Sequence, residues 1–559
     1  MAVAESNMAA TYNTPDHKIF DSHTYVICGD GCLQEGVSSE ACSLAGHLGL
    51  GKLIVLYDDN LITIDGETDL SFSEDVNKRY ESYGWHVQTV SDVEQNLDGL
   101  RKAVAHAKTV TDKPSIIKIR TAIGYGSPLK QGLSAAHGAP LGVDELAITK
   151  KGYGLDPTKS FHVDDDVKAV YAAAVKTAEA KEAEWNTLYA SYKGAHPDKA
   201  AEIERRFNRE IDPAVLAKLP TFVAGKDKDL ATRKFSEGGL NSVAEFLPEL
   251  MGGSADLTPS NLTKITCSGD YQKDTPGGRY MRFGVREHGM AAITNGMFAY
   301  GSFRPFCATF LNFIAYALGS VRLSALSRFG IVYIMTHDSI GLGEDGPTHQ
   351  PVEIIESIRA MPNIKLFRPA DGNETSAAYH SALADSTTPT VICGSRSTCM
   401  SLEASSIEKG LKGGYIAVDP SDPALILIGT GSEVGPCVIA AKNLAAAGIP
   451  TRVVSMPCVE LFLEQSEDYQ KSVLPGNIPT MSVEASATHG WHKFSHAQIG
   501  MTTFGLSGNG NALFKHFGFA HDNIEKQGKA LVDFYKSAGT VPDLNLRPVL
   551  NNITGPSFH

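Results

Sequence analysis

An aspartate and an asparagine each follow an apolar run in the first part of the chain. Asp30 stands between Gly29 and Gly31 directly after YVIC, and Asn60 follows LIVLYDD thirty positions later. Parallel strands joined by a helix bring their carboxyl ends together, so the two side chains are predicted to share one cation with the backbone carbonyl of Ile62. The glycines would let a bulky ligand approach the backbone. A plain glycine turn is the alternative that GDG alone leaves open.

A polar, glycine-rich segment, THDSIGLGEDGPTHQP, carries two histidines and an aspartate. It lacks apolar periodicity, which predicts a loop, and polar side chains on a loop held by rigid elements are suited to ligand contacts. His337 and His349 lie twelve positions apart, with Asp345 between them. Two histidines also suggest a metal pair, but no third ligand has a fitting spacing.

Three aromatic residues, Phe310, Phe313 and Tyr316, recur at every third position in TFLNFIAYAL. They line one stripe if the segment is helical, and they cluster if it forms a looser turn. A core helix is the ordinary explanation of such spacing. Stacking against the ring of a ligand is the functional explanation.

The elements that must position these residues alternate between strand and helix. Seven short apolar runs are each followed by Gly, Asp or Ser, as in buried parallel strands that lead into helices. These runs are residues 25–28, 53–59, 115–121, 331–336, 390–395, 424–431 and 451–457. The predicted class is α/β with mostly parallel sheets.

Two segments indicate domain boundaries. Residues 165–215 are rich in Ala, Lys and Glu, which favours exposed helices that join two compact units. A second boundary is predicted near residues 400–420, ahead of a complete strand, helix and strand unit. We therefore expect three domains, at residues 1–196, 197–406 and 407–559.

Composition limits the classes of function. The chain has 559 residues, too many for one hydrophobic core, and its formal net charge of −13 argues against nucleic acid or an anionic membrane as partner. No apolar run reaches the roughly 20 residues of a membrane span, and the N-terminus lacks a signal pattern. Nine cysteines without paired CxxC spacing fit a reducing compartment. We expect a cytoplasmic protein.

The chain resembles the transketolase family in blocks that follow one another in order: GDGCLQEGVSSEA, YDDNLITIDGET, IGYGS with HGAPLG, ATRKFSE, GGSADLTPSN, GRYMRFGVREHGM, THDSIGLGEDGPTHQP, FRPADGNE and GTGSEV. The resemblance implies a thiamine diphosphate-binding fold with diphosphate-binding, pyrimidine-binding and C-terminal domains. It implies transfer of a two-carbon ketol (glycolaldehyde) unit from a ketose phosphate to an aldose phosphate. It also implies a homodimer whose cofactor lies between the diphosphate domain of one subunit and the pyrimidine domain of the other.

The same resemblance implies catalytic roles for Glu287, His337 and His137. Glu287 would hydrogen bond the aminopyrimidine ring and assist removal of the thiazolium proton, which a dry surrounding favours. A surface ion pair of Glu287 with Arg286 or Arg282 is the alternative. The cofactor would contact Asp30, Gly31, Glu35, Asn60, Ile64, Asp256, Phe310, Phe313 and Tyr316. Asp256 is alternatively a helix N-cap.

Substrate and metal residues are implied in the same way. Guanidinium groups supply bidentate contacts to phosphate, and the sugar phosphates would contact His137, Arg233, Ser260, His337, Asp345, His349 and Arg396. Asp30, Asn60 and Ile62 would hold Mg²⁺, or Ca²⁺ or Mn²⁺ in its place. The cation would keep its other positions for the diphosphate and water.

The start of the chain departs from the family pattern. The family has a segment ahead of the GDG block that supplies histidines and a glycine-rich diphosphate loop, whereas MAVAESNMAATYN resembles the helix after that loop. We therefore expect the first part of the diphosphate domain to be missing and its sheet to bare an edge. Two alternatives follow. One is a catalytically impaired paralogue that acts by dimerisation, including with a full-length subunit; the other is a dihydroxyacetone synthase-like enzyme with formaldehyde as acceptor.

Overall fold

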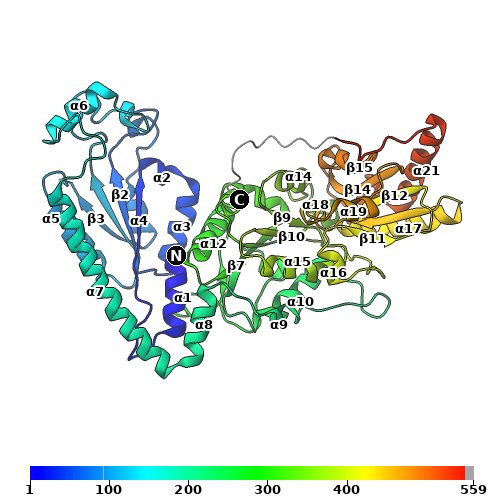
Figure 1. Cartoon of the computed structure of the whole chain (residues 1–559), viewed down its shortest axis with the longest axis horizontal. Helices are drawn as coiled ribbons and strands as arrows, with labels where there is room; N and C mark the ends of the chain where they lie inside the picture. The colour runs from blue at the N-terminus through cyan, green and yellow to red at the C-terminus, as the bar shows by residue number, and fades with distance from the viewer. Residues whose placement is uncertain (92, 548–559) are drawn as a thin grey trace. The chain divides into compact units, whose positions relative to one another are not determined.

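The computed structural model describes residues 1–91 and 93–547 (Figure 1). The chain divides into two compact units. The first comprises residues 1–208, 269–279 and 299–302. The second comprises residues 209–268, 280–298 and the chain from residue 303 onward.

The first unit is built on a four-stranded parallel sheet in the order β1-β2-β4-β3. Its strands are β1 (Thr24–Gly29), β2 (Leu53–Asp59), β3 (His86–Val90) and β4 (Ser115–Arg120). Gly29 is opposite Asp58 in the register, so β1 and β2 end at the same edge of the sheet. The strands predicted at residues 25–28, 53–59 and 115–121 are confirmed.

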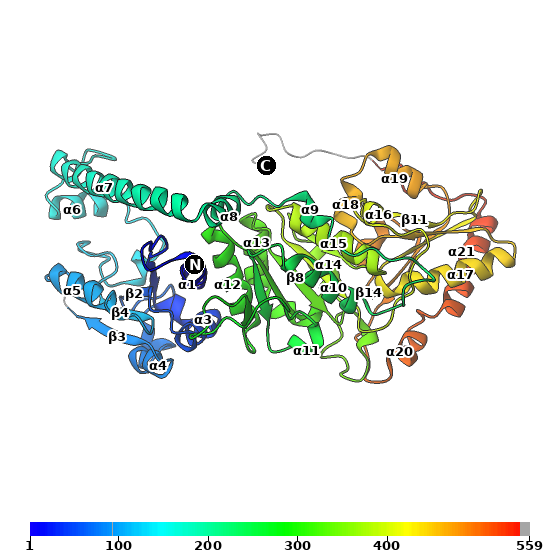
Figure 2. The same cartoon turned by 90° about the horizontal axis from the view of Figure 1, so that it is seen from below.

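Helices precede, join and follow these strands. They are α1 (Ala2–Tyr12), α2 (Asp30–Gln34), α3 (Gly36–His47), α4 (Val76–Ser82), α5 (Leu97–Ala107), α6 (Val143–Gly152), α7 (Asp165–Ala195) and α8 (Pro197–Phe207). Figure 2 shows α7 as one long helix, and Tyr192 is its buried residue. The prediction of exposed helices in residues 165–215 is confirmed.

Strand β1 is an edge strand of this sheet. Tyr25 is 48% exposed and Ile27 is 79% exposed. The prediction that every apolar run is a buried strand is therefore wrong for this one. Side chains of a strand point to the two faces of its sheet, so Tyr25 and Ile27 lie on a face that is left exposed at this strand.

The second unit contains a six-stranded parallel sheet in the order β6-β5-β7-β8-β10-β9. Its strands are β5 (Leu250–Ser254), β6 (Tyr280–Arg282), β7 (Arg304–Phe310), β8 (Val332–Thr336), β9 (Lys365–Phe367) and β10 (Thr390–Gly394). The helices of this region are α9 (Pro213–Leu216), α10 (Thr232–Ala244), α11 (Thr258–Asn261), α12 (Glu287–Tyr300), α13 (Ile314–Leu326), α14 (Ile354–Arg359), α15 (Gly372–Ala384) and α16 (Ile407–Gly410).

A five-stranded sheet in the order β11-β13-β12-β14-β15 completes the second unit. Its strands are β11 (Tyr415–Val418), β12 (Leu425–Gly429), β13 (Thr451–Ser455), β14 (Thr480–Ala487) and β15 (Ala497–Met501). The sheet is mixed because β11 runs antiparallel to β13. The helices are α17 (Val434–Ala446), α18 (Val459–Leu463), α19 (Glu467–Val473), α20 (Gly510–His516) and α21 (His521–Ala538).

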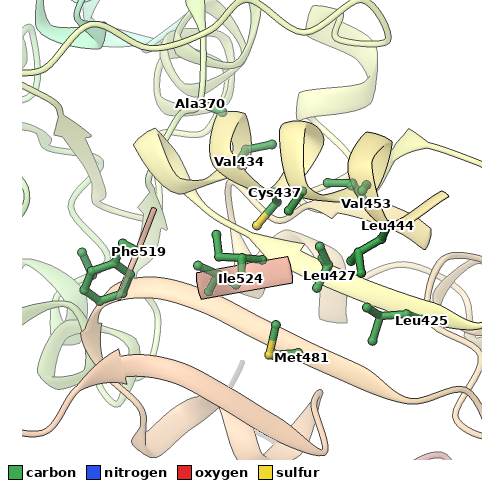
Figure 3. Close-up of a cluster of buried hydrophobic side chains, with 14 of the residues drawn as sticks. Ala370, Leu425, Leu427, Val434, Cys437, Leu444, Val453, Met481, Phe519 and Ile524 are labelled. Atoms are coloured by element: carbon green, nitrogen blue, oxygen red, sulfur yellow. The ribbon is translucent and has the colours of Figure 1, made fainter. Parts of the chain in front are cut away.

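The core of this third sheet is shown in Figure 3. Leu425 and Leu427 of β12 lie in one buried cluster with Cys437 and Leu444 of α17 and Ile524 of α21. Burying a Leu or Ile side chain fully contributes about 1.5–3 kcal/mol, so this cluster fixes both helices on the sheet.

Buried ion pairs join the two sheets of the second unit. Arg368, directly after β9, is fully buried; its Nε lies 3.0 Å from Asp338 Oδ2, and it also pairs with Glu433. Arg359 of α14 makes two hydrogen bonds to Glu484 of β14, at 2.8 and 2.9 Å. Arg359 and Arg368 belong to the region of the six-stranded sheet. Glu433 and Glu484 belong to the region of the five-stranded sheet.

Across the described residues, no helix combines the length and the hydropathy that crossing a membrane requires.

Candidate functional site

Asp30 begins α2 directly after β1 and is only 3% exposed. Its Oδ1 accepts a hydrogen bond from the Tyr57 hydroxyl at 2.5 Å. Its Oδ2 is buried and has no hydrogen-bond partner among residues 1–91 and 93–547. Burial raises the pKa of Asp30, and the bond from Tyr57 and the backbone amides of Leu61 and Asn60 act against that rise. A buried carboxylate oxygen without a partner is costly unless a cation pairs with it.

Asn60 follows β2 at the same edge of the sheet. Its Oδ1 accepts a hydrogen bond from the Ile62 amide at 3.0 Å, and its Nδ2 donates to Asp58 Oδ2 at 3.3 Å. Leu61 between them has a φ of 61°, a left-handed conformation that turns the chain sharply after the strand. The fold therefore brings Asn60 and Asp30 to neighbouring strand ends.

The glycines around Asp30 border open space. A Cβ added at Gly29, Gly31 or Gly36 would meet no atom within 4 Å, and none of the three has a positive φ. No backbone strain in this chain requires glycine there, so room for a ligand is the remaining physical reason. Open space, an unpartnered carboxylate oxygen and an amide oxygen suit a hard cation with a diphosphate.

This arrangement is not a cluster of carboxylates, thiols or imidazoles. No group of three or more His, Cys, Asp or Glu side chains able to hold a metal occurs in the described part of the chain. The predicted ligand set contains one carboxylate, one amide and one backbone carbonyl, so it would not form such a group.

The other residues predicted near the diphosphate are spread along loops. Ile62 is buried, whereas Ile64 is 76% exposed. Gly31 and Glu35 are exposed around the start of α3, and His137 is exposed in the loop before α6.

The three aromatic residues cluster rather than form one helical stripe. Phe310 ends β7, Phe313 lies in a 3-10 turn (Leu311–Phe313), and Tyr316 is in the first turn of α13. Ring centroids are 5.7 Å apart for Phe310 and Phe313, which are stacked, and 6.1 Å apart for Phe313 and Tyr316. Tyr316 is 69% exposed, so the group forms an open aromatic face.

His337 directly follows β8 and packs on this aromatic face. Its ring centroid lies 3.7 Å from that of Phe310, and its φ is 60°. Burial and, after it, the charges of Arg233 and Arg396 lower the pKa of His337 to about 3. His337 is therefore neutral at physiological pH.

The hydrogen-bond network selects one tautomer of His337. The Thr336 hydroxyl donates its single proton to Asn261 Oδ1 at 2.6 Å. The same hydroxyl oxygen lies 2.9 Å from His337 Nδ1, so it accepts the proton of Nδ1. In the neutral ring, Nε2 is left as the acceptor.

Two arginines lie close to His337. Arg233 Nη1 donates to the carbonyl of Ser260 at 2.6 Å, and its Nε is buried without a hydrogen-bond partner within the described residues. Burial lowers the pKa of Arg233, and the charge of Arg396 adds to that effect. Arg396 donates to the carbonyl of Leu342 and pairs with Glu344 at 3.6 Å. Two neighbouring guanidinium groups form a region that attracts an anion.

The loop between β8 and α14 carries the remaining substrate candidates. His349 is partly buried, with its ring 5.0 Å from that of Phe313 and 6.3 Å from that of Phe310. Asp345 is exposed on the same loop. The second unit thus brings together Arg233, Ser260, Phe310, Phe313, His337, His349 and Arg396.

Glu287 and Asp256 lie at or near the starts of helices of the second unit. Glu287 is half-buried as the first residue of α12, where the helix dipole favours a negative charge. The dry surrounding expected of Glu287 stays a prediction. Asp256 is exposed with a φ of 61°, and Leu257 occupies the N-cap of α11, so the N-cap alternative is wrong.

Several residues that contact the candidate site residues or their neighbours were not predicted. Tyr57 and Asp58 hold Asp30 and Asn60, and Asp338, which follows His337, pairs with Arg368. Tyr57 and Asp58 could have been found from the sequence, because both belong to the same YDDN stretch as Asn60. No local pattern pointed to Arg368, whose partners are distant in sequence.

Three protein-family models match the chain in order. They are the transketolase thiamine diphosphate binding domain at residues 1–212, the transketolase pyrimidine binding domain at 228–400 and the transketolase-like C-terminal domain at 413–520. The first model matches from residue 1, and the expectation of a missing part of this domain stays a prediction.

Relatives and solved structures agree with these models. Transketolase 1 of Saccharomyces cerevisiae is 50% identical over 543 residues, covering 96% of this chain and 80% of that protein. The Pichia stipitis transketolase complexed with sedoheptulose 7-phosphate has 48% identity and a TM-score of 0.95, covering 97% of this chain and 81% of that one. Transketolase from Leishmania mexicana has 47% identity and a TM-score of 0.94, covering 97% and 80%. The chain belongs to the transketolase family, whose members are thiamine diphosphate-binding transferases.

Proposed function

We propose that the chain transfers a two-carbon ketol unit from a ketose phosphate to an aldose phosphate. The main support for this proposal is that Arg233, Arg396 and neutral His337 lie close together, with His337 beside Phe310. Such a surface binds the phosphate of a sugar through the guanidinium groups and offers an apolar ring face beside it.

Magnesium and thiamine diphosphate are the proposed cofactors. Asp30 Oδ2, Asn60 Oδ1 and the carbonyl of Ile62 would hold the cation, with Ca²⁺ or Mn²⁺ able to replace it. Gly31, Glu35 and Ile64 would border the diphosphate. When bound, thiamine diphosphate supplies the electron sink for cleavage of a bond next to a carbonyl group.

The side chains of this chain have distinct tasks in the proposal. Phe310, Phe313 and Tyr316 orient the aminopyrimidine ring by stacking, with Asp256 at its edge. Glu287 holds a proton at the same ring. Arg233, Ser260, Arg396, His337 and His349 bind the sugar phosphate, whereas Asp345 and His137 contact substrate hydroxyl groups and the reacting end.

We also propose a homodimer in which Asp30 of one subunit and Glu287 of the other serve the same cofactor. The half-buried position of Glu287 supports this, because a second subunit would supply the dry surrounding that one chain lacks. The nine cysteines are unpaired, which supports the cytoplasmic location. The domain limits remain as proposed, at 1–196, 197–406 and 407–559.

A transfer assay tests the function. Purified chain is incubated with a ketose phosphate donor and an aldose phosphate acceptor, with and without thiamine diphosphate and Mg²⁺. We expect transfer only when both cofactors are present. An inert chain with saturating cofactors would favour the impaired paralogue, and faster transfer to formaldehyde than to an aldose phosphate would favour the dihydroxyacetone synthase-like enzyme.

A further inference from the structure

We infer that Tyr57 and Asp58 are positioning residues that aim one oxygen of Asp30 and one of Asn60 at the cation. The inference rests on the proposed metal site and extends it to two side chains that are not among the proposed cofactor and substrate contacts. All four residues belong to the first unit.

Tyr57 determines which oxygen of Asp30 is free. It lies in β2 opposite Cys28, is 1% exposed, and donates to Asp30 Oδ1 at 2.5 Å. That bond occupies one carboxylate oxygen and fixes the rotation of the group. Oδ2 is then the oxygen without a partner in the described chain.

Asp59 is a second carboxylate near Tyr57, but it already has cationic partners. Arg120 Nη2 lies 2.8 Å and Lys118 Nζ 3.4 Å from Asp59 Oδ2. The Tyr57 hydroxyl is 3.2 Å from Asp59 Oδ1, a longer separation than its bond to Asp30. The hydroxyl has one proton, which it donates to Asp30, so Asp59 is a neighbour of the tyrosine rather than its acceptor. Asp30 remains the buried carboxylate that lacks a cation in the described chain.

Asp58 determines how the amide of Asn60 is turned. Its Oδ2 accepts from Asn60 Nδ2 at 3.3 Å, and its Oδ1 accepts from the hydroxyl of Thr121, which follows β4. With the NH₂ group directed at Asp58, the amide oxygen faces the Ile62 backbone. One lone pair of that oxygen is left for a cation.

Hydrogen bonds to a metal ligand typically change metal affinity by 10- to 100-fold when they are removed. We therefore test Tyr57→Phe and Asp58→Ala by titrating each protein with Mn²⁺ in the presence of thiamine diphosphate, with calorimetry as the readout. Each variant should raise the Kd for Mn²⁺ by about tenfold. At saturating Mg²⁺ the transfer rate should return to the wild-type level, because both ligands are still present.

Tyr80→Phe is the matched control. Tyr80 is equally buried in the first unit, but its hydroxyl bonds the Cys42 thiol at 3.3 Å rather than a candidate ligand. Its Kd for Mn²⁺ should equal that of the wild type, and thermal unfolding without cofactor checks that all variants are folded.

Each outcome has one meaning. Wild-type protein that fails to bind Mn²⁺ with thiamine diphosphate overturns the metal site itself and this inference with it. Wild-type binding with an unchanged Kd in folded Tyr57→Phe and Asp58→Ala overturns the positioning role alone. If one of the two does not fold, the Kd of the other decides.

Discussion

At the scale of single residues, the site contains groups whose environment is unfavourable without a ligand. Asp30 has a buried oxygen without a partner, and His337 is a buried histidine facing two arginines. Such features lower stability and are retained where function requires them. Each can be tested by a conservative substitution.

Asp30→Asn should remove the metal site without damaging the fold. The amide oxygen still accepts from the Tyr57 hydroxyl, and the new side chain carries no buried charge. The free energy of unfolding of the cofactor-free protein should therefore increase by about 1 kcal/mol. Metal-dependent binding of thiamine diphosphate should be lost, with activity reduced at least about 100-fold. Chemical denaturation and cofactor titration measure the two effects. Lower stability together with normal cofactor binding would contradict the account.

His337 should stay neutral through the physiological range. Its pKa of about 3 lies below the ordinary value of 6.5 because of burial and the two arginines. Between these values the unfolded chain binds more protons, so this residue makes stability rise with pH from about 3 to 6.5. His337→Gln should flatten that part of the stability curve.

Nuclear magnetic resonance of the ring nitrogens gives a direct check. The His337 signals should show a proton on Nδ1 and no titration between pH 5 and 8. Arg396→Gln removes one repelling charge and should raise the pKa. Titration of wild-type His337 near pH 6.5 would contradict the described surroundings.

At the scale of elements, the sequence was most informative where strands are apolar throughout. All seven apolar runs are strands, and apart from the exposed edge strand β1 they are apolar because buried parallel strands need apolar side chains on both faces. β5 was missed because LMGGS resembles a turn. Its glycines are required by close packing: a Cβ at Gly252 would lie 1.8 Å from the Phe306 carbonyl and one at Gly253 1.7 Å from that of Met281.

β14 was missed for a different reason. Ser482, Glu484 and Ser486 are buried in it, and a glutamate inside a strand argues against burial unless its partner is known. The partner is Arg359, more than a hundred residues earlier. The candidate site shows the same limit of local sequence patterns. The motifs indicated Asp30, Asn60 and the loop histidines, but not the residues that hold them.

Arg368→Met tests the buried ion pairs between the two sheets of the second unit. The substitution leaves Asp338 and Glu433 buried without their cation. The free energy of unfolding should therefore decrease by about 3–5 kcal/mol. Urea denaturation followed by tryptophan fluorescence, to which Trp85, Trp185 and Trp491 all contribute, measures this loss. Lys471→Met, which breaks an exposed pair with Glu467, is the control and should change little. Equal effects would show that burial of the pair does not matter.

Glu374 of α15 should make the stability of the second unit depend on pH. Burial, and then the charge of Asp371, raise its pKa to about 7. The folded state therefore holds a proton that the unfolded state releases, and this contribution falls as pH rises from about 4.5 to 7. Glu374→Gln should remove that slope in thermal unfolding measured across this range. An unchanged slope would contradict the assignment.

In the whole molecule, the proposed cofactor site requires two subunits. Asp30 belongs to the first unit of the chain and Glu287 to the second, and the proposal places them at one cofactor only by pairing different subunits. Each subunit of a symmetric dimer contributes to both sites, so two different inactivating substitutions can complement each other.

Mixing two inactive variants tests this claim most directly. Asp30→Asn and Glu287→Gln proteins are each assayed for transfer, then mixed in equal amounts under conditions that allow subunit exchange. Half of the dimers would be mixed and each would contain one intact site, so activity should recover to about one quarter of the wild-type value. No recovery after proven exchange, or full activity in either variant alone, would contradict the account.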